Sequence, residues 1–418
     1  MPVKIRILSA ANKHMQRAGF LKLLAAQVAR VETSSLSALG GKLVETVTKR
    51  VRVSPPFSDS LREYVQIRLS YDKMYADLRA AVLSGKVPVN LELQDLYLSD
   101  PSLPSSTGKL AADSERRYPY LGTALDLIKP GTWSAMTRSI LLTHLTPKEE
   151  LAAWENYSPP NNPLIISREQ AAVILYCFLD NDALVLLPLF TKLLELSSAG
   201  FDERTAGDFL PAILRGATST LNKGSLAFED RERLGQLDKA AENIERWRGK
   251  PYTGGGAREE NIRGRIEPFC DLGLFTKPDR HRFTYKLTPA FKRFMADWNG
   301  TDIDYFLENR FFTTLAAMHG LTTVKPAGDT DARDALRDAG EALKSTLGYS
   351  PIRDCSLLAG TRLLFDHQRV LELGTSFNTL RDWQKAAPEI VRFTVDRMGE
   401  LAYVKFLKPA SPPAHANA

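Results

Sequence analysis

Residues 258–275 read REENIRGRIEPFCDLGLF, and residues 283–295 read FTYKLTPAFKRFM. In the first string, Ile262, Ile266 and Phe269 recur at positions i, i+4 and i+7. This spacing places the three side chains on one face of a helix. The stretch is therefore predicted to begin with a helix that has one apolar face.

The residues that follow predict a β-hairpin and a second helix. Gly273 is expected to end the first helix, because a residue without a Cβ adopts the left-handed C-terminal conformation at little cost. Phe275 begins a strand, and Tyr285 lies at the centre of an alternating apolar pattern that predicts the returning strand. Thr288 and Pro289 have the residue types of an N-cap and a first helical position.

Helix, basic hairpin and helix in this order resemble the winged helix-turn-helix superfamily, with residues 258–271 in the position of the recognition helix. Arg and Asn side chains form bidentate hydrogen bonds with purine edges, and cations in the hairpin turn would bind phosphates. The candidate DNA contacts in this stretch are Arg258, Asn261, Arg263, Arg265, Lys277, Arg280, His281, Arg282 and Lys286.

Two further segments resemble the same superfamily. Residues 351–387 predict two or three helices, and residues 390–407 predict a hairpin with a Met-Gly turn. Residues 375–385 would then be a second recognition helix. Residues 120–145 form a weak internal repeat of residues 258–298. The candidate DNA contacts in these two segments are Asn378, Arg381 and Lys385, followed by Arg116, Arg117 and Arg138.

Positive charge is concentrated in two segments of a chain whose net charge is only +6. Residues 248–293 carry eleven Lys and Arg against five Asp and Glu, and residues 1–53 carry ten against two. A surface that binds a polyanion requires such concentration, because each Lys or Arg placed on a phosphate releases counterions. A charged surface that serves only solvation is the alternative for either segment alone.

The most apolar stretch, residues 171–196, is predicted to form a buried helical pair. Asp180, Asn181, Asp182 and Pro188 interrupt it, so a membrane span is not expected. The N-terminus lacks the pattern of a secretion signal, and three widely separated cysteines suit a reducing compartment. The sequence therefore predicts a cytoplasmic protein without membrane contact.

The sequence contains no motif of a known catalytic or cofactor site. It has no phosphate-binding loop, and its histidines and cysteines show no metal-ligand spacing, so we expect neither a metal nor a cofactor. Asp396, Glu400 and Lys405 are residue types found in metal-dependent nucleases. Their place in a short predicted hairpin favours a solvated strand pair instead.

The predicted fold class is mainly α-helical and multi-domain, with two or three winged-helix-like units bearing short β-hairpins. At 418 residues the chain accommodates two to four domains of about 100–200 residues. The predicted segments are a basic N-terminal helical segment (1–57), a helix with an extended arm and linker (58–108), a winged-helix-like unit (109–145), an apolar helical core (146–228), a winged-helix DNA-binding unit (229–298), an acidic helical connector (299–350), a C-terminal winged-helix-like unit (351–408) and a disordered tail (409–418).

These features predict a non-enzymatic protein that binds double-stranded DNA, either as a regulator or as the DNA-recognition subunit of a larger bacterial complex. Other protein subunits or a second copy of the chain are further expected partners. The alternative is a protein-interaction scaffold, such as an adaptor in a defence or restriction-type assembly, with only nonspecific nucleic-acid contact. In that case the predicted modules serve only packing or association.

Overall fold

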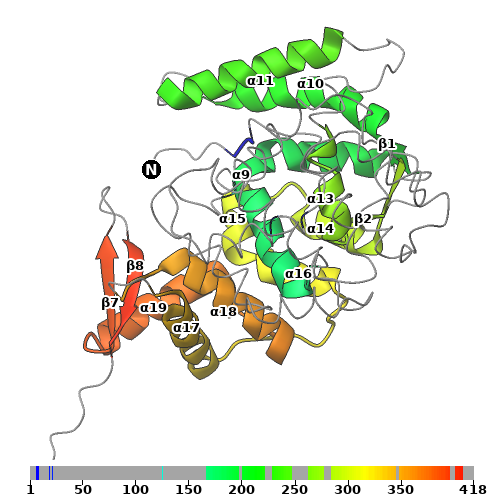
Figure 1. Ribbon diagram of the computed structural model, residues 1–418. Helices are drawn as coiled ribbons and strands as arrows, with labels where there is room; N and C mark the ends of the chain where they lie inside the picture. The colour runs from blue at the N-terminus through cyan, green and yellow to red at the C-terminus, as the bar shows by residue number, and fades with distance from the viewer. Residues whose placement is uncertain are drawn as a thin grey trace, which may run out of the picture.

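The computed structural model describes residues 6–8, 18, 21, 125, 166–196, 200–221, 228–246, 262–276, 284–344, 348–395 and 401–407. This part of the chain is mainly α-helical, with short strands gathered into small sheets (Figure 1). The predicted segment 58–108 and the predicted tail lie outside the described residues, as do nearly all of 1–57 and 109–145.

Helix α9 (Arg168–Glu195) lies at the centre of the molecule. It begins with a capping box in which the Ser167 side chain accepts the N–H of Gln170 and the Gln170 side chain accepts the N–H of Ser167. Ser followed three residues later by Gln is the sequence pattern of such a box. Residues 168–195 form one helix of 28 residues, not the pair predicted within residues 171–196.

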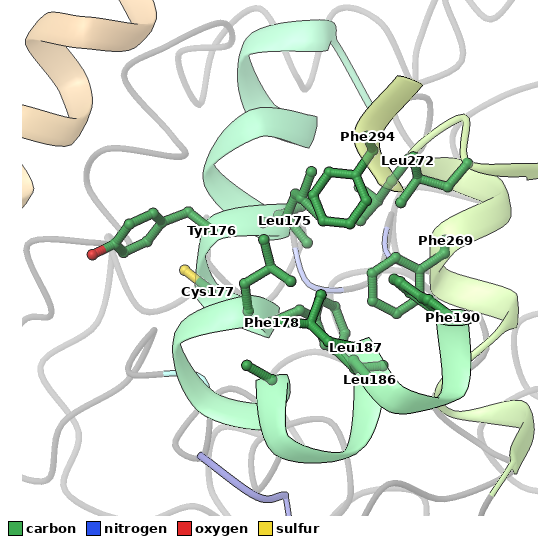
Figure 2. Packing of buried hydrophobic residues seen from close by; sticks show 14 of the residues in the cluster. Leu175, Tyr176, Cys177, Phe178, Leu186, Leu187, Phe190, Phe269, Leu272 and Phe294 are labelled. Atoms are coloured by element: carbon green, nitrogen blue, oxygen red, sulfur yellow. The ribbon is translucent and has the colours of Figure 1, made fainter. Parts of the chain in front are cut away.

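The predicted burial of this apolar stretch is confirmed. By length and composition α9 is one helix that could cross a membrane, but 89% of its most apolar window is buried inside the fold. Phe190 of α9 makes an edge-to-face contact with Phe269 at a ring-centroid distance of 5.1 Å, and Leu175 and Leu187 lie in the same cluster (Figure 2). The helix is therefore the centre of the larger hydrophobic core.

The middle of α9 departs from regular helix geometry. The N–H of Leu184 donates to the carbonyl oxygen of Arg6 at 3.1 Å, a partner outside the helix. Pro188 lies one turn later and has no N–H to donate. The ribbon changes direction between Phe178 and Leu186 (Figure 2), as expected where the helical hydrogen-bond ladder is interrupted.

Short strands and helices build a first unit onto α9. It consists of β1 (Phe201–Asp202), α10 (Glu203–Thr220), α11 (Phe228–Arg246), α13 (Glu267–Asp271), β2 (Phe275–Thr276) and β3 (Thr284–Leu287). β3 pairs antiparallel with both other strands, so the sheet order is β1-β3-β2. Phe201 stacks on Tyr285 across the sheet at 5.3 Å between ring centroids.

Several local predictions for this unit are confirmed. Ile262, Ile266 and Phe269 are fully buried as predicted, but the predicted helix over 258–271 is not continuous, because residues 264–266 form a turn before the five-residue α13. Gly273 follows the helix with φ at +76°, the conformation for which glycine is favoured. After β3, Thr288 caps the next helix by accepting the N–H of Phe291.

Three helices connect this unit to the C-terminal part of the chain: α14 (Pro289–Trp298), α15 (Ile303–Asn309) and α16 (Phe311–Met318). α14 packs against α16, and both α14 and α15 contact α9. After α16 the chain forms β4 (Lys325–Pro326), which pairs parallel with β6 (Arg369–Val370).

A second unit follows, with its own hydrophobic core. It comprises α17 (Asp329–Leu343), β5 (Ser350–Pro351), α18 (Ile352–His367), α19 (Leu373–Ala386), β7 (Val391–Val395) and β8 (Leu401–Phe406). The sheet order is β5-β8-β7, with both neighbours antiparallel to β8. The two helices and the hairpin predicted after residue 351 are thus present, together with a strand, β5, that sequence reasoning missed.

The two units share one topology. Each runs helix, strand, helix, helix, strand, strand, and in each sheet the last strand lies between the other two. α9 corresponds to α17, α10 to α18, and α13 to α19, while α11 is additional in the first unit and β6, which pairs with β4 outside this sheet, is additional in the second. The structural repeat therefore relates residues 168–287 to 329–406. Of the predicted repeat partner 120–145, only Leu125 is described.

A substitution at Gly360 tests how closely α18 packs against α16. A Cβ at this position would lie 2.3 Å from a ring carbon of Phe312 and 2.8 Å from the carbonyl oxygen of Leu371. Gly360→Ala is expected to lower the free energy of unfolding by about 1–3 kcal/mol, measured by urea denaturation. The matched control is Gly235→Ala in α11, where a Cβ meets nothing within 4 Å. It should stabilise by up to about 1 kcal/mol, and the reverse order of midpoints would contradict this packing.

Candidate nucleic-acid interface

The structure describes only part of the central DNA-binding prediction. Lys286 is exposed on β3, whereas Arg263 and Arg265 are 2% and 1% exposed. The other candidates of the stretch 258–286 and all candidates near residues 116–138 lie outside the described residues. They are Arg258, Asn261, Lys277, Arg280, His281 and Arg282 in the first set, and Arg116, Arg117 and Arg138 in the second.

Arg265 forms a buried ion pair with Asp182 of α9. Its Nε lies 2.7 Å from Asp182 Oδ2, and its Nη2 lies 3.2 Å from Oδ1. The same Nη2 donates to the carbonyl oxygen of Leu8 at 2.7 Å, while Asp182 Oδ1 accepts the N–H of Leu8 at 2.8 Å. The pair therefore binds both polar groups of one N-terminal residue inside the core.

The neighbouring charged residues of this segment are also paired internally. Arg263 donates to both carboxylate oxygens of Glu203 on α10, at 2.5 and 3.0 Å. The Tyr285 hydroxyl donates to Glu267 at 2.7 Å. Burial, reinforced by the charge of Glu267, raises the pKa of Tyr285 well above its usual value. Tyr285 is therefore a neutral hydrogen-bond donor at physiological pH.

Two predicted contacts must be corrected on these observations. Arg263 and Arg265 are not surface residues available to DNA, because every residue from 262 to 269 is buried. The apolar spacing correctly identified the core face, but a helical segment enclosed on all sides has no opposite solvent face. Its cations are neutralised by Glu203 and Asp182, which lie far away in the sequence.

A second charged cluster joins the two units around Asp180 of α9. Asp180 forms ion pairs with Arg6 and with Arg353 of α18, and Arg6 also pairs with Asp304 of α15. Arg353 Nε donates to the Tyr176 hydroxyl at 3.0 Å, and its guanidinium lies 5.1 Å from that ring's centroid. The cluster therefore fixes α18 of the second unit against α9 of the first.

Helix α19 presents the remaining predicted DNA contacts. Asn378, Arg381 and Lys385 are all exposed and follow one another at i, i+3 and i+7. Leu380 and Trp383 are buried on the other side of the helix. Arg381 lies over the Phe377 ring at 5.5 Å, and Lys385 pairs with Asp382 at 3.3 Å. All three side chains therefore lie on one exposed face of α19.

Glu372 positions the start of α19. It occupies the N-cap position of α19, and its carboxylate accepts the N–H groups of Phe312 and Thr313 and the Thr313 hydroxyl at 2.7–3.0 Å. These donors lie at the N-terminus of α16, where a negative charge is favoured. One side chain therefore holds α19 against the connecting helices.

Sequence reasoning missed the acidic partners of the central arginines. From the sequence alone, Asp180 and Asp182 are only interruptions of an apolar stretch, and Glu203 has no predicted role. Three polar residues in succession within a buried helix are a usable signal, because buried charges are nearly always paired. Nothing in the sequence identifies which distant cation provides the partner.

Comparison of the chain with protein-family models, with curated proteins and with solved structures gave no match.

Asp182 tests the buried pair. Asp182→Ala leaves the Arg265 guanidinium in the core without its carboxylate, and is expected to lower the free energy of unfolding by about 3–5 kcal/mol. The double variant Asp182→Leu/Arg265→Leu removes both charges and should be more stable than Asp182→Ala. Exposed Lys286→Ala serves as the control, with an effect within about 0.5 kcal/mol in urea denaturation. A single variant as stable as the control would show that this pair does not hold the core together.

Glu372 gives the fold a defined pH dependence. Burial raises its pKa above 4.5, although its hydrogen-bond donors act in the opposite direction. Because the folded pKa exceeds the unfolded value, its contribution to stability is complete below pH 4.5 and is lost as pH rises through the raised pKa. Urea midpoints measured upward from pH 4.5 should therefore fall more steeply for the wild type than for Glu372→Gln. Parallel profiles would contradict this assignment.

Proposed function

We propose that this protein binds double-stranded DNA through its C-terminal unit, with α19 as the recognition helix. The observation that carries the proposal is the exposed row of Asn378, Arg381 and Lys385 along one face of α19. The role is that of a non-enzymatic regulator or of the DNA-recognition subunit of a larger bacterial complex.

The topology of the second unit supports this proposal. Three helices and a three-stranded sheet with the last strand in the centre are the arrangement of a winged helix-turn-helix. In helix-turn-helix proteins the recognition helix enters the major groove, and its side chains contact base edges. In this proposal α19, the third helix of the unit, has the role of the recognition helix, and the β7–β8 hairpin that follows it has the role of the wing.

The chemistry of the α19 face supports the same proposal. Asn378 has the side chain that forms two hydrogen bonds with adenine, and Arg381 the one that does so with guanine. Lys385, whose side chain is 77% exposed, suits a backbone phosphate. The stacking of Arg381 on Phe377 restricts the arginine before any ligand binds, which reduces the entropy lost on binding.

The first unit has a different role in this proposal. Its α13, which corresponds to α19, begins in the core, and the arginines that precede it, Arg263 and Arg265, are paired with Glu203 and Asp182. We propose that this unit supports the second unit by rigid contact through Asp180 and Arg353. The competing function is that of a protein-interaction scaffold. It is favoured by α13, which presents no exposed row of cations that could contact DNA.

Substitutions in α19 test DNA binding directly. Lys385→Ala should weaken binding to a labelled duplex and reduce the slope of log affinity against log salt by about 1, because it removes one phosphate contact. Arg381→Ala should cost about 1–3 kcal/mol of binding free energy and relax the preference for guanine, because it removes a base contact. Asn378→Ala should relax base preference more than it weakens overall affinity. Fluorescence anisotropy across a salt series measures both effects.

Matched controls come from the first unit. Arg215 is an exposed arginine paired with Glu245, and Lys192 is an exposed lysine with an acid at i+3, as Lys385 has an acid at i−3. Arg215→Ala and Lys192→Ala should leave duplex affinity unchanged. If the wild type fails to bind duplex DNA at low salt and co-purifies with other chains, the scaffold function is correct instead.

A further inference from the structure

The sheet of the second unit has one covered face and one open face. Val391 and Val404 are fully buried, and Phe406 contacts Trp383 of α19 at 5.7 Å between ring centroids. Because side chains alternate along a strand, Tyr403 and its neighbours two residues away lie on the opposite face. Tyr403 is 41% exposed. The open face is therefore directed away from α19, and the hairpin lies at the edge of the molecule (Figure 1).

Cations and aromatic rings form two adjacent rows across this open face. In the first row Arg392 lies directly opposite Lys405, and Lys405 Nζ lies 5.0 Å from the centroid of the Tyr349 ring. In the second row Thr394 lies opposite Tyr403. Arg392 and Lys405 therefore concentrate positive charge at one place on the open face.

The register of the two strands shifts between Thr394 and Val395, so the alternation that assigns Tyr403 to the open face does not extend to the exposed Val395 and Leu401 at the hairpin tip. The open face itself combines two cations with the exposed ring of Tyr403. It therefore fits a ligand with both negative charges and flat apolar faces. Unpaired nucleotides have these properties, whereas the bases of a duplex are already stacked within it.

We infer that the open face of the β5-β8-β7 sheet binds single-stranded nucleic acid. Arg392 and Lys405 contact the phosphates, and Tyr403 stacks on a base. This inference goes beyond the proposed duplex binding, because the two surfaces lie on opposite sides of the sheet. A protein with both surfaces holds a duplex next to an unpaired strand.

The experiment uses the full chain and a labelled 12-nucleotide oligo(dT), which cannot form a duplex. Tyr403→Ala is expected to weaken binding about five-fold or more, because stacking on an aromatic side chain contributes substantially for each base. Tyr403→Phe retains the ring and should bind as the wild type does. Arg392→Gln/Lys405→Gln should reduce the log–log salt slope by about 1.4, the value for two single-strand phosphates.

Two controls separate this inference from duplex binding. Tyr305 on α15 is 55% exposed, so Tyr305→Ala removes an equally accessible ring elsewhere and should leave oligo(dT) affinity unchanged. Arg381→Ala should weaken duplex binding but not oligo(dT) binding, and Tyr403→Ala should do the reverse. Thermal melting of each variant checks that it is folded.

Three results would overturn the inference. The first is a wild type that does not bind oligo(dT) at low salt, and the second is a Tyr403→Ala variant that binds it unchanged. The third is light scattering that shows a wild-type dimer lost in Tyr403→Ala while nucleic-acid affinity is kept. That last outcome would identify the open face as a surface for a second copy of this chain.

Discussion

The ion pair between Asp182 and Arg265 is the constraint on which the first unit depends. Both side chains are almost completely removed from solvent, and a buried charge is tolerated only when its partners are well placed. Asp182 interrupts an apolar helix, so a cation must come to it from elsewhere in the chain. Arg265 meets that requirement and brings the segment before α13 against the middle of α9.

The same pair determines the path of the N-terminal segment. Leu8 donates to Asp182 and accepts from Arg265, while the carbonyl oxygen of Arg6 accepts the N–H of Leu184. The irregular middle of α9 thus offers a hydrogen-bond donor and a charged pair to an extended segment. A regular apolar helix could not bind a peptide backbone in this way, because its own polar groups would all be paired internally.

The two units show how one topology leads to different surfaces. In the first unit α13 packs against α9 through Phe269, and the two arginines that precede α13 pair with acids of α9 and α10 inside the fold. In the second unit α19 is covered on one side only, where Leu380 and Trp383 enter a smaller core. The charged cluster of Asp180, Arg6 and Arg353 joins the units, so the open helix is held on a rigid support.

The sequence by itself determined the local elements, because the forces that set them act within a few residues. Apolar spacing identified Ile262, Ile266 and Phe269 as residues of the core, and Gly273 and Thr288 marked a helix end and a helix start.

Only the tertiary structure decided which of the predicted helices is open. Arg263 and Arg265 share their residue type with Arg381 and fall in a stretch that the sequence predicts to be a helix, so no local pattern distinguishes a paired core arginine from a surface one. Their burial depends on Asp182 and Glu203, which are 83 and 60 residues away in the sequence. Strand β5 was likewise missed, because a two-residue strand acquires its identity only from β8, which pairs with it.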